Sequence, residues 1–219
     1  MIIFSAIYLL FLCAYFITRT GNNIKIRAIN KYILASMYLI YSIVMFYTRD
    51  LSSYYYVLMA ALFFACLGDI FLVFDFKKGG NFFLTCNICF SIFYLLLLHN
   101  NSIPFVNYFW VFIVWGILIG GFVYLSNKYP QIIKLEKMKK PMIIYLSSIT
   151  LHGLLGLASA IVINTTPILL MGIGSLLFMV SDYILTTDRF IVRKNKWIVR
   201  SNSLTYFVGM LLIVLSMGL

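Results

Sequence analysis

The chain has 219 residues, of which 63% are hydrophobic and only 11% are charged, and its mean hydropathy is +1.00. A single globular core of this length cannot bury so much apolar surface, which excludes an ordinary soluble domain and indicates a protein whose helices lie in lipid. The formal net charge of +11 would suggest nucleic-acid binding in a soluble protein. Here the basic residues lie in short loops, where membrane topology explains them, and we expect no nucleic-acid partner.

Eight apolar runs follow one another along the chain, each about long enough to cross a bilayer as a helix. They cover residues 2–18, 32–48, 54–74, 82–98, 105–125, 141–163, 167–187 and 202–218. The first run lacks a basic segment before it and an A-x-A cleavage site, so we interpret it as a retained span. Backbone groups in lipid must be satisfied within their own segment. The sequence therefore predicts an all-α protein with one domain, residues 1–219, forming a polytopic transmembrane bundle of eight helices.

The basic residues alternate between loops, and this alternation tests the number of spans. The first, third, fifth and seventh loops hold 16 of the 17 Lys and Arg residues, and only Arg49 lies in an even loop. One span more or fewer in the middle of the chain would destroy the alternation. The positive-inside rule then places the odd loops in the cytoplasm and both termini outside. We expect an integral protein of the cell membrane.

The four cysteines, Cys13, Cys66, Cys86 and Cys89, all lie in apolar runs, so a disulfide framework is not expected. Cys86 and Cys89 form a CxxC inside a span without partner ligands. We interpret them as packing residues rather than as a redox or metal site. No metal and no cofactor are expected.

Two acidic residues, Asp69 and Asp182, interrupt the apolar runs. Each lies six residues before a second Asp, Asp75 and Asp188 respectively, on a span predicted to run from outside to the cytoplasm. At about 1.5 Å per residue, this spacing places both acids about 9 Å inside the cytoplasmic boundary, where they could face each other. The similar segments GDIFL and SDYIL around them suggest a four-plus-four internal duplication.

The acid pair has two readings. A charged carboxylate in hydrocarbon costs on the order of 3 kcal/mol, so it usually faces a partner or a cavity. In the first reading each Asp is only a polar clamp that bonds a neighbouring helix. In the second, which we favour, the pair forms a site open to the cytoplasm, with one neutral and one ionised carboxyl group. Such a pair can donate a proton, stabilise positive charge and activate water.

The residues around these acids resemble a known family. The similarity is carried by ACLGDIFLVFD (65–75), GSLLFMVSDYILTTDRF (174–190), YFVGMLLI (206–213) and the stretch 140–145, which begins with Lys-Pro. These segments are similar to the YhhN family, the lysoplasmalogenase-like membrane proteins, in order over most of the chain. The resemblance implies hydrolysis of the vinyl ether bond of lysoplasmalogens to a fatty aldehyde and glycerophospho-choline or -ethanolamine. Asp69 and Asp182 would be the catalytic residues.

The chain departs from the family's pattern at three places. Phe90-Ser91 stands where the family often carries Ala-His, Met210 stands where it has a Gln, and Lys31-Tyr32 replaces its Lys-Pro. The loss of the His and the Gln removes polar partners from the implied cavity.

The implied substrate is a lysophospholipid that enters from the inner leaflet of the membrane. The residues expected to bind it are Lys31, Ser91, Tyr94, Lys140, Tyr145, His152 and Tyr206. A topogenic role for the lysines and ordinary packing for the tyrosines are the alternatives. His152, beside Gly153 and Gly156, either bonds across a close helix contact or compensates for the missing family histidine.

In the implied reaction one neutral Asp protonates the alkene carbon and the other stabilises the resulting cation and orients water, as in glycoside hydrolysis. Which Asp has which role is not specified by the sequence, nor is an oligomeric state. The alternative is a non-catalytic membrane carrier or lipid-binding protein whose acids bind a proton or a cation. A purely structural membrane protein is a third interpretation.

Overall fold

The computed structural model describes residues 2–133, 135, 138–191 and 195–219. These residues form eight α-helices and one short 3-10 helix, and no strand occurs among them. The elements are α1 (Ile2–Thr18), α2 (Ile24–Thr48), α3 (Tyr55–Phe71), α4 (Phe76–Asn100), η1 (Phe105–Asn107), α5 (Trp110–Lys128), α6 (Lys139–Ile163), α7 (Thr166–Phe190) and α8 (Lys196–Ser216). The predicted all-α bundle of eight helices is confirmed.

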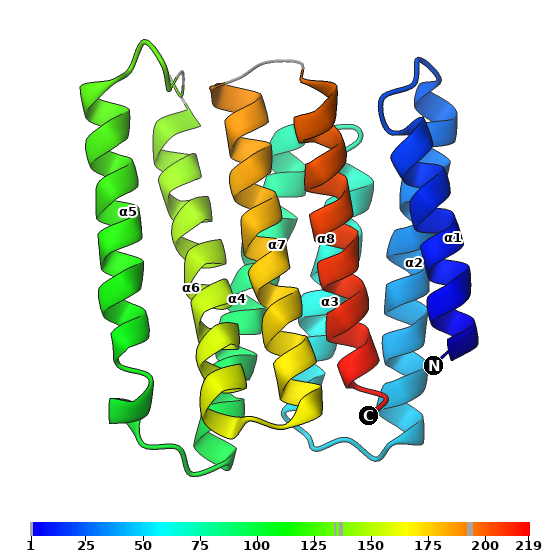
Figure 1. Ribbon diagram of the computed structural model, residues 1–219, viewed down its shortest axis with the longest axis vertical. Helices are drawn as coiled ribbons and strands as arrows, with labels where there is room; N and C mark the ends of the chain where they lie inside the picture. Colours follow the sequence, from blue (N-terminus) through cyan, green and yellow to red (C-terminus); the bar gives the residue numbers. More distant parts are fainter. Residues whose placement is uncertain (1, 134, 136–137, 192–194) are drawn as a thin grey trace.

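The helices run up and down beside one another, with α7 and α8 in front of α3 and α4 (Figure 1). The pair α5 and α6 forms one flank of the bundle, and α1 and α2 form the other. Helix α4 packs against α6, and α2 packs against α8. If α1 to α4 are matched in order with α5 to α8, the contacts between successive helices in one half have counterparts in the other, and the α4–α6 contact corresponds to the α2–α8 contact. This arrangement fits a four-plus-four duplication, which stays a prediction.

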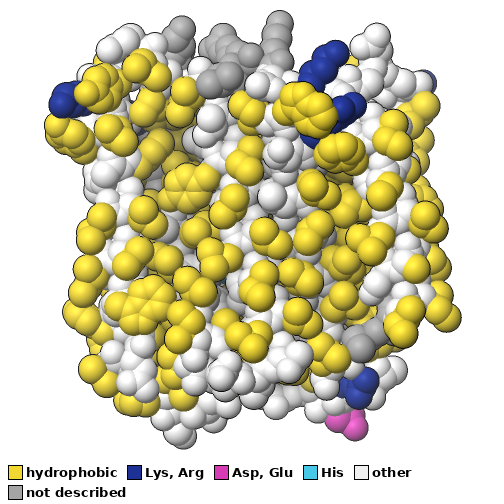
Figure 2. All heavy atoms as spheres, in the orientation of Figure 1, with side chains coloured by type: hydrophobic (Ala, Val, Ile, Leu, Met, Phe, Trp, Pro, Cys, Tyr) yellow, Lys and Arg dark blue, Asp and Glu magenta, His cyan; other side chains and the backbone are white. Residues whose placement is uncertain are grey.

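Six of the helices are long and apolar enough to cross a membrane. The other two, α1 and α3, are apolar but have 17 residues each, about 25 Å of helix and the lower limit for a span. Hydrophobic side chains cover the middle of the molecular face in Figure 2, and Lys and Arg appear only toward its two ends. The lengths and the surface both fit a bundle embedded in lipid.

Three helices begin six to eight residues before the apolar runs that predicted them, at residues 24, 76 and 196. Each start has a side-chain cap: Asn23, Asp75 and Asn195 accept hydrogen bonds from backbone N–H groups of the first turn. Such caps fix where a helix begins whatever its hydropathy. The apolar runs therefore mark only the lipid-embedded part of longer helices.

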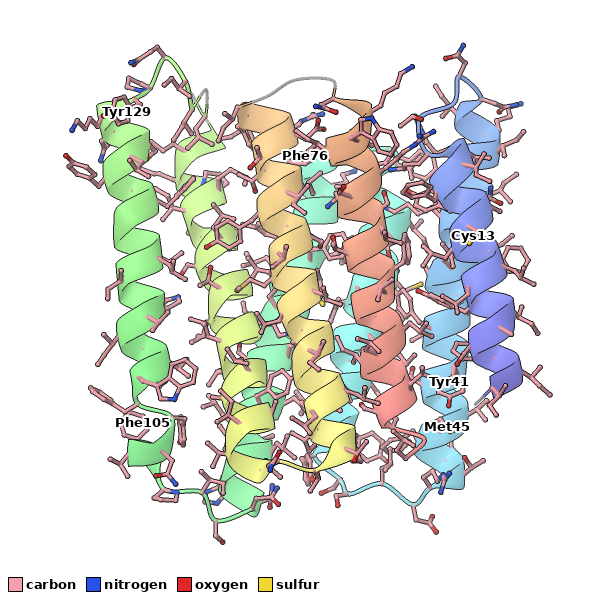
Figure 3. The ribbon with its side chains drawn as sticks, viewed as in Figure 1. Cys13, Tyr41, Met45, Phe76, Phe105 and Tyr129 are labelled. Atoms are coloured by element: carbon pink, nitrogen blue, oxygen red, sulfur yellow. The ribbon has the colours of Figure 1, made fainter. Side chains whose placement is uncertain are left out.

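The boundary predicted at residue 105 is wrong. Pro104 is extended, residues 105–107 form the separate 3-10 turn η1, and α5 begins at Trp110. Proline disfavours helical backbone in the residue before it and offers no N–H group. Phe105 and Val106 are 53% and 77% exposed, so this apolar turn lies on the surface at the end of the bundle, where Figure 3 labels Phe105.

The described parts of the four odd loops lie at one end of the bundle, and both termini lie at the other (Figure 1). We call the first the basic end. Its described basic residues are Arg19, Lys25, Arg27, Lys31, Lys77, Lys78, Lys128, Lys139, Lys140, Arg189, Lys196 and Arg200. Lys134, Lys137, Arg193 and Lys194, which also entered the charge count, lie outside the described residues. The loops thus share one end as expected, and the placement of that end in the cytoplasm stays a prediction.

Helices α7 and α8 approach each other closely, which brings their functional side chains into one region. A Cβ atom added to Gly174 would lie 2.6 Å from the backbone oxygen of Gly209, and one added to Gly209 would lie 2.7 Å from that of Gly174. Only glycine allows two helix backbones to approach this closely. Tyr206 lies one turn before Gly209 and is held near α7 by this contact.

Candidate active site

Asp69, which is only 1% exposed, has a complete set of partners. Its Oδ1 atom lies 3.1 Å from the Lys31 ammonium. Its Oδ2 atom accepts hydrogen bonds from the hydroxyl groups of Tyr38 at 3.0 Å and Tyr206 at 2.8 Å. Lys31 and Tyr38 lie two turns apart on one face of α2, and Tyr206 comes from α8. Three helices therefore converge on one compensated carboxylate.

Asp182, which is 5% exposed, has a different environment. The Tyr145 hydroxyl donates a hydrogen bond of 2.5 Å to its Oδ2 atom. The Ser181 hydroxyl lies 3.5 Å from Oδ1 and donates its shorter bond, 2.7 Å, to the backbone oxygen of Phe178. Within the described part of the chain no Lys or Arg forms a salt bridge with Asp182. Among the residues that the structure describes, the hydrogen bonds to this carboxyl group come from hydroxyl groups alone.

The two acids interact electrostatically but share no hydrogen-bond partner. Both also interact electrostatically with the thiol of Cys86, which is fully buried in α4. They therefore occupy one polar region, each with its own partners. The sequence spacing predicted that the two acids could face each other. In the structure no hydrogen bond joins their carboxyl groups directly.

The equal depth predicted for the two acids is wrong in one detail. Asp182 lies within continuous helix as far as Phe190, whereas α3 ends at Phe71, two residues after Asp69. The six-residue spacing to Asp75 thus includes a tight turn, and the rise of 1.5 Å per residue holds only inside a helix. The estimate of about 9 Å applies to the Asp182–Asp188 spacing alone.

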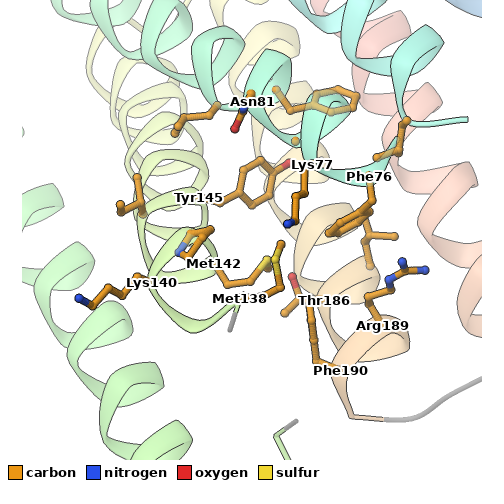
Figure 4. Close-up of a pocket in the computed structure, with 17 residues that line it drawn as sticks. Phe76, Lys77, Asn81, Met138, Lys140, Met142, Tyr145, Thr186, Arg189 and Phe190 are labelled. Carbon is orange, nitrogen blue, oxygen red and sulfur yellow. The ribbon is translucent and has the colours of Figure 1, made fainter. Parts of the chain in front are cut away.

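A cavity of about 490 Å³ opens at the basic end between α4, α6 and α7 (Figure 4). Most of its described lining side chains are apolar, and the cations among them are Lys77, Lys140 and Arg189. Neither aspartate lines it. Tyr145 does, and its hydroxyl bonds Asp182. Tyr145 is therefore the side chain that connects the cavity with an acid.

Phe83 connects the same cavity with the surroundings of Asp69. Its ring lines the cavity, and its centroid lies 5.9 Å from that of Tyr206. A Cβ atom added to Gly68 would lie 2.8 Å from the Phe83 ring, so α3 carries glycine where this ring packs beside Asp69. One aromatic ring thus separates the cavity from the Asp69 cluster.

A second polar cluster lies deeper in the bundle. The Ser175 hydroxyl is 3.1 Å from Nε2 of His152 and 2.5 Å from the hydroxyl of Tyr94. The His152 ring also stacks on Phe90, with centroids 4.3 Å apart. His152 follows Tyr145 by seven residues on α6, about 10 Å farther from the basic end. Neither aspartate bonds this cluster.

Six of the seven predicted substrate-binding residues thus fall into three groups. Lys31 and Tyr206 bond Asp69, so the Lys31 ammonium that was expected to bind the substrate already has a partner. Tyr145 and Lys140 line the cavity. Tyr94 and His152 belong to the deeper cluster.

Three of the positions that depart from the family's pattern, Phe90, Ser91 and Met210, are buried in the packing. Phe90 is fully buried against His152, and Met210 is fully buried in α8. Ser91 is also buried, and its hydroxyl donates to the backbone oxygen of Asn87, one turn earlier on the same helix. None of the three contacts either aspartate through a hydrogen bond.

The sequence alone did not identify three residues of the candidate site: Tyr38, which bonds Asp69, and Lys77 and Arg189, which line the cavity. Tyr38 follows Lys31 by seven residues, the spacing that places two side chains on one helix face, and this signal would have found it. Lys77 and Arg189 were counted only as loop charges, because nothing local shows that α4 and α7 bring them to one cavity.

A sequence model of the YhhN family matches residues 31–217, which include every residue described around the two acids. No curated protein and no solved structure matches the chain.

Proposed function

The chain belongs to the YhhN family, and we propose that it hydrolyses the vinyl ether bond of lysoplasmalogens. The products would be a fatty aldehyde and glycerophosphocholine or glycerophosphoethanolamine. The observation that carries the proposal is the difference between two buried carboxyl groups: Asp69 is paired with a cation and Asp182 is bonded only by hydroxyl groups.

This difference supports distinct roles for the two acids. A carboxyl group with an ammonium at 3.1 Å favours its ionised form. A buried carboxyl group without a cation avoids the cost of an uncompensated charge by remaining protonated. In the proposed mechanism Asp182 is the proton donor and Asp69 is the permanent anion.

The reaction begins when the Asp182 proton is transferred to the alkene carbon that is not bonded to oxygen. The adjacent carbon becomes an oxocarbenium ion, and the negative charge of Asp69 stabilises it. Water then adds to this carbon and returns a proton to the Asp182 carboxylate. The resulting hemiacetal breaks its bond to the glycerol oxygen, which takes up the hydroxyl proton, and the aldehyde is released.

Tyr145 would position the acid for this step. Its hydroxyl bonds Asp182 and its ring lines the cavity, so the substrate's alkene would approach from the side where Tyr145 stands. The hydrogen bond also fixes the orientation of the carboxyl group, which general acid catalysis requires.

The test is aldehyde release by the purified protein in detergent, with lysoplasmalogen as the substrate. Asp69→Asn and Asp182→Asn keep the size of each side chain and remove its charge or its acid. We expect each change to lower the rate by at least about 100-fold, the scale of a lost general acid or electrostatic partner. A saturated alkyl ether lysophospholipid is the substrate control and should yield no aldehyde. Full activity in either variant would overturn the acid-pair mechanism.

Lipid binding without turnover is the second candidate. Asp69 already holds Lys31, so the acids offer no free anionic site for a cation from solution, whereas the largely apolar cavity suits a lipid chain. Wild-type protein that binds lysoplasmalogen and releases no aldehyde under any condition would favour this candidate.

A further inference from the structure

The rim of the cavity carries more positive charge than the described residues balance. Lys77, Lys140 and Arg189 line the cavity, and none of them forms a salt bridge with a described acidic residue. The nearby Asp75 carboxylate is engaged, because it accepts the backbone N–H groups of Lys77 and Lys78. Asp188 interacts electrostatically with its neighbour Arg189 and offsets part of this charge. Among the described residues the opening therefore keeps a net positive charge, with Lys77 and Lys140 in no salt bridge.

Two helix N-termini meet at the same opening. The first turns of α4 and α6 both contribute lining residues, among them Phe76, Lys77, Lys140 and Pro141. Helix α6 has no side-chain cap, so N–H groups of its first turn remain available to a ligand. The dipole of α6 adds positive potential there, which favours an anion, whereas the N-terminus of α4 is already capped by the Asp75 carboxylate.

The cations are arranged around the cavity rather than scattered over the surface. In Figure 4 the Lys77 side chain extends toward the middle of the ring of lining residues, and Lys140 and Arg189 lie on opposite sides. The guanidinium carbon of Arg189 lies 4.7 Å from the centroid of the Phe76 ring, which holds the side chain at the rim. Below the rim the lining becomes apolar, and the cavity reaches Tyr145.

We propose that this cavity selects single-chain lipids that carry a phosphate, with Lys77, Lys140 and Arg189 binding the phosphate and the apolar walls binding the chain. The three cations would then determine specificity, because a neutral alkenyl glycerol with the same cleavable bond lacks the group they recognise. The identity of the bond cleaved rests on the proposed function, whereas the selection of the phosphate does not.

The test measures binding of a lipid that cannot be hydrolysed. Native mass spectrometry of the full chain in detergent gives the Kd for hexadecyl-glycerophosphocholine, which has a saturated ether chain. Hexadecylglycerol supplies the same chain without phosphate, and glycerophosphocholine supplies the same headgroup without a chain. We expect the first ligand to bind at least about tenfold more tightly than either of the others, as charge-assisted contacts to a phosphate would give.

The chain offers a matched control for charge. Lys77→Gln/Lys140→Gln removes two lining cations, and Lys78→Gln/Lys139→Gln removes their sequence neighbours, which do not line the cavity. We expect the first pair to weaken binding of the phosphate lipid at least about tenfold and leave hexadecylglycerol unchanged, and the second pair to have less than about a twofold effect. Equal losses in the two double variants would overturn the proposal, because they would indicate surface charge alone.

Two further outcomes would contradict the proposal. Equal affinity for hexadecylglycerol would show that the phosphate is not selected, and equal affinity for glycerophosphocholine would indicate a site for free phosphate esters instead of a lipid. A protein that binds the phosphate lipid as expected but releases no aldehyde from lysoplasmalogen would refute the proposed function and leave this inference standing.

Discussion

Replacing Lys31 with Met removes the cation that contacts Asp69 and leaves a carboxyl group that is 1% exposed. Removing one partner of a buried ion pair costs about 3–5 kcal/mol, because the remaining charge is uncompensated. The hydroxyl groups of Tyr38 and Tyr206 remain and reduce this cost, so we expect the free energy of unfolding to fall by about 3 kcal/mol.

Removing the charge of Asp69 instead of that of Lys31 should cost less stability. Lys31 is 12% exposed and lies near the basic end, so after Asp69→Asn its long side chain can turn toward the headgroup region. We expect a loss of about 1 kcal/mol for this variant. The double variant Lys31→Met/Asp69→Asn removes both charges and should recover about 2 kcal/mol relative to Lys31→Met alone.

These free energies can be measured by SDS titration in mixed micelles, followed by tryptophan fluorescence. Lys31→Arg keeps the cation and is the matched control. A Lys31→Met variant within about 0.5 kcal/mol of wild type, or a double variant equal to the sum of the single losses, would refute the buried ion pair.

Two other predictions follow from single contacts, and a third tests the predicted topology. Tyr145→Phe removes the hydroxyl that bonds Asp182 and should lower aldehyde release at least about tenfold, with the midpoint of thermal unfolding little changed; an unchanged rate would remove Tyr145 from the mechanism. Gly79→Ala places a Cβ atom 2.7 Å from backbone atoms of Leu72, which follows α3, and should destabilise the protein by about 1–3 kcal/mol. Gly80→Ala places its Cβ atom where no other atom lies within 4 Å and should be neutral in the same thermal unfolding measurement. In a cysteine-free background, Ser53→Cys in the loop after α2 should react with a membrane-impermeant maleimide in intact cells, and labelling only after permeabilisation would reverse the predicted topology.

The helices and their order could be predicted because hydropathy and loop charge are local properties of the sequence. The lipid-embedded part of each helix appears directly as an apolar run, and the charge of the odd loops placed those loops at one end. The starts of α2, α4 and α8 were missed because their caps lie in polar sequence. An apolar turn at residues 105–107 was mistaken for helix because hydropathy does not distinguish the membrane interface from its interior.

The sequence predicted which acidic residues belong to the candidate site, but it did not predict which residues they contact. Asp69 and Asp182 stand out because a carboxyl group in an apolar run is costly. The partner of Asp69 is a lysine that reads equally well as a loop charge, and whether it turns inward depends on how α2 packs against α3 and α8. His152 was considered as a replacement for a histidine near the acids, and the register of α6 with α7 brings it to Ser175 instead.

The most direct measurement is hydrolysis of lysoplasmalogen by the purified protein in deuterium oxide, with the aldehyde analysed by mass spectrometry. Because the solvent-exchanged Asp182 acid would deliver a deuteron to the alkene carbon, the account predicts one deuterium on the carbon next to the aldehyde group. It also predicts that Asp182→Asn lowers the yield at least about 100-fold. An aldehyde without deuterium at that carbon, or an undiminished yield from Asp182→Asn, would contradict proton transfer from Asp182.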